Sequence, residues 1–173
     1  MDHIEFLKHS FKEAIKFEQY GREFFLKAAN EAKNPLAKEI FSKLAEEELK
    51  HIKRIKDVFD ALTQNNKWPD QTPISENLPW KHIFKEALNN FNKMVNPSTS
   101  DSEALQLGLD FESKGYKFYN EMVQKSINPV EKSFFEFLRD EEQGHYLIIQ
   151  NLKKYMENPL DWYGEEEHHI FEG

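Results

Sequence analysis

The sequence predicts an all-α fold, a four-helix bundle with a long crossover connection between its second and third helices. Four long stretches place apolar residues at helical spacing, only six glycines and seven prolines interrupt the chain, and two Asn-Pro pairs divide the stretches into hairpins. With 173 residues and 39% hydrophobic content, the chain can bury a substantial core. We therefore expect a single domain over residues 1–173.

The first helix is predicted over residues 3–32. Its apolar residues recur every three or four positions, and Glu18 falls within this apolar stripe. The pair Asn34-Pro35 follows, and proline favours a helix start while it disfavours a helical conformation in the residue before it. We therefore expect the chain to turn at this pair.

The second helix is predicted over residues 35–62. Its apolar stripe is interrupted in the middle by Glu48 and His51. Residues 63–100 are rich in turn-forming residues and are interpreted as the crossover connection, with a short helix at 80–95.

The third helix is predicted over residues 101–126 and the fourth over 129–156. A helix start at Asp101 or Ser102 would have both an N-cap and an acidic first turn. The second Asn-Pro pair separates these two helices. Residues 157–173 remain as a tail.

An internal repeat relates the two predicted hairpins. A shift of 94 residues, without a gap, places Glu112 on Glu18 and the pair Glu142-x-x-His145 on Glu48-x-x-His51. Between residues 14–57 and 108–151, 13 of 44 aligned positions are identical. This similarity indicates duplication of a helix hairpin, in which the same polar residues occupy equivalent core positions twice.

The repeated polar residues have the spacing of metal ligands. Residues three apart lie about 60° apart around a helix, so the glutamate and histidine of each pair can reach one ion. Glu18 and Glu48 lie at similar distances from the first turn, which brings them to similar heights in an antiparallel pair. Two such hairpins facing each other would pool four glutamates and two histidines.

Composition excludes several functional classes. The net charge of −8 disfavours binding to nucleic acid, and no segment approaches the roughly 20 apolar residues of a membrane span. The absence of cysteine excludes disulfides, thiolate nucleophiles and Cys-ligated clusters. With no apolar signal-peptide segment at the N-terminus, we expect a cytoplasmic protein.

At these residues the chain resembles the ferritin-like superfamily, most closely the rubrerythrin-type di-iron carboxylate proteins, over residues 3–156. The resemblance implies that two shared glutamates bridge two metal ions, that one histidine caps each ion, and that the remaining glutamates are terminal. The implied ligands are Glu18, Glu48, His51, Glu112, Glu142 and His145, with Glu48 and Glu142 bridging.

The sequence differs from this family in two ways. The Cys-ligated rubredoxin module is missing, so turnover would need an external electron donor such as a rubredoxin-like protein. Rubrerythrins also carry an extra glutamate three residues after the ligand of the third helix, where this chain has Gly115. That glutamate is associated with redox-linked iron movement and peroxide reduction, so its absence weakens the expectation of peroxidase activity.

The leading functional prediction is a di-iron oxidoreductase in oxidative-stress defence. It would act on O2 or peroxide, oxidise ferrous iron, or both, and we expect a homodimer. Carboxylate and imidazole ligands suit iron or manganese, and zinc could also occupy the site. The alternatives are an iron-handling or storage ferroxidase and a helical scaffold with a vestigial metal site.

Several other residues carry weaker signals. Glu47 and Glu141 also repeat and are expected on a solvated face, with a supporting role beside the metal ligands as the alternative. Tyr119 is expected to pack in the core, with hydrogen bonding near the site as the alternative. We expect His3 at the surface and Trp68 packed against the bundle.

Two Glu-x-x-His pairs in the tail, Glu165–His168 and Glu166–His169, have no repeat partner. A single pair of this kind is weak evidence for a metal site. We expect these four side chains to be solvated.

Overall fold

A computed structural model describes residues 2–65, 68–69 and 99–160. This part of the chain forms four long helices and is all-α. The helices are α1 (His3–Glu31), α2 (Pro35–Asn65), α4 (Thr99–Lys125) and α5 (Pro129–Glu157). None of them is long and apolar enough to cross a membrane.

The helix ends differ from prediction mainly at the crossover. Helix α2 continues to Asn65 instead of ending at 62, and the Thr63 hydroxyl bonds back to the Phe59 carbonyl within it. Helix α4 begins at Thr99. The predicted short helix at 80–95 and most of the predicted tail lie outside the described residues.

The predicted helix start near Asp101 or Ser102 is two or three residues late, but the predicted acidic first turn is confirmed, since Asp101 lies in the first turn of α4. Asp101 also binds another part of the molecule. Its carboxylate accepts hydrogen bonds from the backbone N–H groups of Lys33, at 3.1 Å, and Asn34, at 2.9 Å. These bonds tie the α1–α2 turn to the beginning of α4. They also satisfy two backbone donors that the turn would otherwise bury.

The two Asn-Pro pairs start α2 and α5 as the sequence predicts. The Asn34 side-chain oxygen accepts from Leu36 N–H at 2.8 Å, and the Asn128 oxygen accepts from Glu131 N–H at 2.9 Å. Each bond satisfies an amide that has no partner inside its helix. The prolines follow at the first helical position, where no amide is needed.

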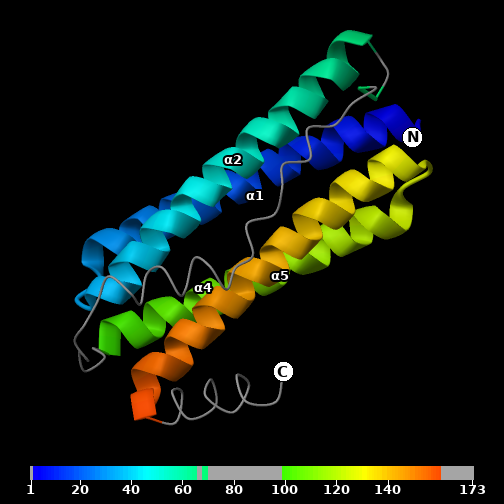
Figure 1. The fold of residues 1–173 in the computed structure, drawn as a ribbon. Helices are drawn as coiled ribbons and strands as arrows, with labels where there is room; N and C mark the ends of the chain where they lie inside the picture. The colour runs from blue at the N-terminus through cyan, green and yellow to red at the C-terminus, as the bar shows by residue number, and fades with distance from the viewer. Residues whose placement is uncertain (1, 66–67, 70–98, 161–173) are drawn as a thin grey trace.

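The helices form two antiparallel hairpins, α1 with α2 and α4 with α5, which pack side by side (Figure 1). The C-terminal end of α2 and the N-terminal end of α4 lie at opposite ends of the bundle (Figure 1). With 31 residues, α2 is about 46 Å long. Residues 66–98 therefore link ends that are separated by the length of the bundle, and the predicted four-helix bundle is confirmed.

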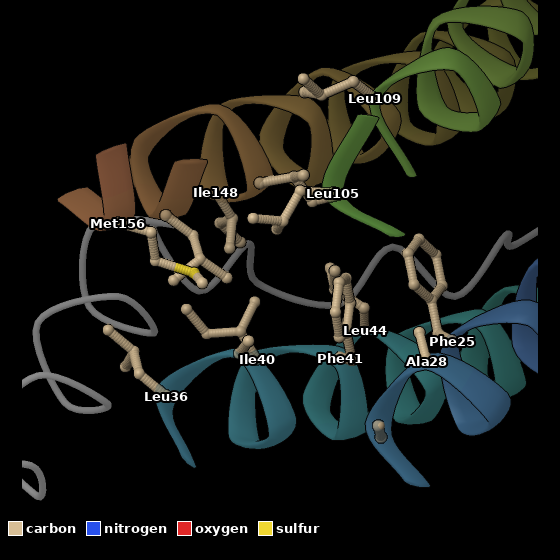
Figure 2. Packing of buried hydrophobic residues seen from close by; sticks show 14 of the residues in the cluster. Phe25, Ala28, Leu36, Ile40, Phe41, Leu44, Leu105, Leu109, Ile148 and Met156 are labelled. Carbon is tan, nitrogen blue, oxygen red and sulfur yellow. The ribbon is translucent and has the colours of Figure 1, made fainter. Parts of the chain in front are cut away.

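Two apolar clusters fill the bundle, one on each side of its middle. Figure 2 shows the first, where Phe41 and Leu44 of α2 lie across from Leu105 of α4, and Leu109 belongs to the same cluster. The second lies toward the N-terminal end of α1 and includes Phe11, Ile55, Tyr119, Phe135 and Leu138. Along every helix, the predicted ligands lie between residues of these two clusters.

Two further residues also have defined positions. Trp68 packs against the rings of Phe11, Phe134 and Phe135 at 5.7–6.2 Å, as predicted. The surface position expected for His3 is wrong. Its side chain is only 24% exposed, and Nε2 lies 3.0 and 3.1 Å from the two oxygens of the buried Glu131. This contact joins the beginnings of α1 and α5.

Candidate metal centre

The bundle brings all six predicted ligand side chains together at its middle. Five are fully buried, and His145 is 4% exposed. They form two overlapping groups, each with one donor atom per residue and all donor atoms within 4.8 Å of one another. The groups are Glu18, Glu48, His51 and Glu142, and Glu48, Glu112, Glu142 and His145.

In the first group, His51 turns its Nδ1 atom toward three carboxylates. This atom lies 3.2 Å from Glu18 Oε2, 3.6 Å from Glu48 Oε2 and 3.5 Å from Glu142 Oε1. We call this part of the centre the Glu18–His51 end. The three-residue spacing on α2 places Glu48 and His51 on one face of the helix.

The second group repeats this arrangement from the other hairpin. His145 Nδ1 lies 3.4 Å from Glu48 Oε1 and 3.6 Å from Glu112 Oε2. We call this part the Glu112–His145 end. The imidazole rings of His51 and His145 stack with centroids 5.3 Å apart, so the two ends are adjacent.

The polar atoms of this centre fit two divalent cations. No hydrogen-bond partner among the described residues reaches either oxygen of Glu48, Glu112 or Glu142, or Nδ1 of His145. Each such atom buried without a partner costs about 1–3 kcal/mol. Two divalent ions would neutralise four carboxylates and would give these atoms the partners they lack.

The proton affinities of the carboxyl groups show the electrostatic strain in the absence of metal. Burial, and then repulsion from Glu48, raises the pKa of Glu18 to about 8. Burial and the surrounding carboxylates also raise the pKa of Glu142 well above its usual value. Burial raises the pKa of Glu48 too, but contacts with Glu18, His145 and His51 outweigh it, and that pKa falls below its usual range.

The pKa values of both histidines are raised, because the carboxylates around them outweigh the effect of burial. Burial lowers the pKa of His145, but attraction to Glu112 and contact with Glu48 outweigh it and raise the pKa to about 10. The pKa of His51 is raised well above its ordinary value, since Glu18 outweighs burial in the same way. Protons therefore provide, in the metal-free protein, part of the positive charge that cations would supply.

Two repeat-related glycines make room for the shared carboxylates. A Cβ atom on Gly21 would lie 2.6 Å from the Phe111 ring and 3.4 Å from Glu48 Cδ. A Cβ atom on Gly115 would collide with Glu142 Oε2. Gly115 is the position where rubrerythrins carry their extra glutamate, so the Glu142 carboxylate occupies space that this side chain would enter.

Two nearby residues lie closer to the centre than the sequence predicts. The core tyrosine, Tyr119, donates a hydrogen bond to Glu18 Oε1. Glu141, expected on a solvated face, lies 3.9 Å from His51 Nε2 with its side chain only 18% exposed. Their positions carried a signal, since Tyr119 stands two helical turns after Glu112 and Glu141 adjoins a predicted ligand.

The two Glu-x-x-His pairs of the tail lie outside the described residues.

Comparison with known proteins agrees with the geometry. The family model described as Rubrerythrin matches residues 9–153. A hypothetical protein from Pyrococcus furiosus has a similar fold, with a TM-score of 0.64 and 21% identity over 88% of this chain and 90% of that one. Comparison with curated proteins gave no match. These 173 residues include no cysteine that could form a rubredoxin module. Because the family model covers most of the chain, the chain belongs to the rubrerythrin family, of which it has the four-helix domain.

Proposed function

We propose that the centre holds two iron ions and that the protein is an oxidoreductase acting on O2 or peroxide, on ferrous iron, or on both. Glu18, Glu48, His51, Glu112, Glu142 and His145 would be the ligands, with Glu48 and Glu142 shared between the ions. The observation that carries this proposal is the pair of overlapping donor groups, which are buried and largely without protein partners.

Bound iron would supply one electron per ion, two per centre, to an oxidant. The protein contributes the surroundings of the reaction. The apolar clusters on both sides keep bulk water away from the carboxylates, and burial strengthens every charge interaction between them. The rings of Phe17 and Phe111 stack with their centroids 4.2 Å apart. Phe111 lies beside Gly21, and Phe17 lies beside Gly115.

The free oxygens allow the carboxylates to adapt. Both oxygens of Glu48, Glu112 and Glu142 are without hydrogen-bond partners among the described residues, so each carboxylate can bind through one oxygen or two. Such freedom suits a centre whose ions change charge.

A vestigial site is a poor explanation of this arrangement. Among the described residues, eight buried carboxylate or imidazole atoms of these ligands have no hydrogen-bond partner, and at about 1–3 kcal/mol each they would be a large loss in a protein whose net stability is about 5–15 kcal/mol. A purely structural core would be more stable with apolar side chains at these positions.

Metal analysis and rapid kinetics test the proposal. Protein purified without added metal should contain two ions per chain, and the ferrous-loaded protein should be oxidised rapidly by O2 or peroxide. Replacing Glu48 by alanine together with His145 by alanine should abolish metal content while helicity is retained. Stoichiometric iron without reactivity toward either oxidant would overturn the oxidoreductase assignment.

The electron donor and the assembly remain predictions. In the absence of a rubredoxin module in this chain, we expect an external donor such as a rubredoxin-like protein, and we expect a homodimer. Sedimentation of the metal-loaded protein tests the second expectation, because a large cage would indicate iron storage instead.

A further inference from the structure

The two ends of the centre are built from repeated sequence, but their supports differ. Tyr119 donates a hydrogen bond to Glu18 Oε1 at the Glu18–His51 end. The repeat-equivalent residue on the other hairpin is Phe25, which has no hydroxyl group. Both oxygens of Glu112 correspondingly have no hydrogen-bond partner among the described residues.

By the repeat, Phe25 holds the position on α1 that Tyr119 holds on α4, from which Tyr119 reaches the glutamate of the other hairpin. Its ring points from α1 toward α4 (Figure 2), and its Cε1 atom would lie 3.5 Å from a Cβ on Gly108. Gly108 is one helical turn before Glu112 on α4. The difference between the two ends is therefore one of side-chain chemistry and not of backbone position.

A second, independent difference concerns the histidines. Glu141 lies 3.9 Å from His51 Nε2, the ring nitrogen that faces away from the centre. The repeat-equivalent carboxylate, Glu47, instead pairs with Lys50 at 2.6 Å. Within the described part of the chain, no carboxylate lies within 4.0 Å of His145 Nε2.

One neighbouring residue accounts for the different choices of these two glutamates. Lys50 stands three residues after Glu47, which places its ammonium group on the same helix face. The equivalent position after Glu141 is Gly144, which offers no cation. Glu141 is therefore free of an ion pair of this kind on its own helix and faces the imidazole across the bundle.

Both differences favour the same end. At 3.9 Å, Glu141 is too far from His51 Nε2 for a hydrogen bond, and this nitrogen has no hydrogen-bond partner among the described residues, but a negative charge beside the ring still increases the basicity of the imidazole. The Tyr119 hydroxyl holds Glu18 so that its other oxygen, Oε2, stays 3.2 Å from His51 Nδ1. Pre-arranged ligands bind an ion with a smaller ordering cost, which increases affinity.

We propose that Tyr119 and Glu141 are positioning residues that make the Glu18–His51 end the tighter of two unequal metal positions. The Glu112–His145 end is then the exchangeable position, through which an ion such as ferrous iron enters and leaves. His145 is the one ligand of the six with measurable exposure, at 4%, which agrees with access from this side. This inference rests on the proposed metal centre.

Titration of metal-free protein with Mn2+, followed by the electron paramagnetic resonance of the free ion, tests the inference. The unaltered chain should bind two ions in steps separated by at least about tenfold. Tyr119→Phe and Glu141→Gln should each weaken the tighter step by about 10–100-fold and leave the weaker step unchanged. Phe25→Tyr should strengthen the weaker step, and this variant remains informative if Tyr119→Phe folds poorly.

Glu47→Gln is the matched control, because it removes the repeat-equivalent carboxylate and should move neither step. Crystals grown with one equivalent of Mn2+ should show the anomalous peak at the Glu18–His51 end. Equal affinities, equal peaks or a first peak at the Glu112–His145 end would overturn the inequality and leave the metal centre standing. Absence of Mn2+ from both ends would overturn the centre as well.

Discussion

Glu18→Gln should make the metal-free protein more stable while it weakens metal binding. The Glu18 side chain is fully buried, and burial with repulsion from Glu48 raises its pKa from 4.5 to about 8. Glutamine has nearly the same shape, carries no charge at any pH, and can still accept the Tyr119 hydrogen bond through its oxygen.

The size of the effect follows from the change in pKa. The raised pKa means that the folded protein tolerates protonated Glu18 better than ionised Glu18. The stability that depends on this proton is therefore fully present below pH 4.5 and is lost as the pH rises toward 8. At 1.36 kcal/mol per pKa unit, the loss is about 3 kcal/mol at pH 7 and about 5 kcal/mol above pH 8. Glutamine avoids this loss.

Urea unfolding of metal-free protein in EDTA, at pH 5, 7 and 8.5, measures the difference. The advantage of the variant should be small at pH 5 and should grow with pH. Glu121→Gln, at an exposed ion pair with Lys125, should change stability by at most about 1 kcal/mol at every pH. A Glu18→Gln protein that is less stable than the unaltered chain, or an advantage independent of pH, would refute the reasoning.

Three further predictions concern metal loading. At pH 7 Glu18 and His145 are protonated in the metal-free protein, and a metal ligand must be deprotonated. Metal binding should therefore release at least two protons, which calorimetry in buffers of different ionisation enthalpy would measure. Gly115→Ala should displace Glu142 and weaken Mn2+ binding at least about tenfold. Gly108→Ala is the control and should bind normally, because its Cβ would meet no ligand, only Ile149 at 3.1 Å and the rings of Phe25 and Phe24 at 3.5 and 3.7 Å. Saturating metal should raise the melting temperature, and an unchanged melting temperature on removal with EDTA would contradict the proposed centre.

The sequence was sufficient to predict the helices and the cluster of polar side chains. Apolar spacing depends on helix geometry alone, and the two Asn-Pro pairs mark the turns with local chemistry. The six repeated polar positions could be assigned to one centre because a duplicated hairpin places equivalent residues at equivalent heights.

The sequence was insufficient where one residue has several possible partners. His3 was expected at the surface and Asp101 only at the start of the third helix, and each joins segments far apart in the chain. Such contacts depend on which helix ends meet. Local patterns do not contain that information.

By itself, then, the sequence determined the all-α class, the two related hairpins and the polar residues at their cores, because these follow from periodicity and repetition. Only the tertiary structure decided that Glu141 lies beside His51 across the bundle and that the Tyr119 hydroxyl meets Glu18. The physical reason is that a repeat preserves positions along the helices, whereas the choice of partner depends on which side chains converge across the bundle.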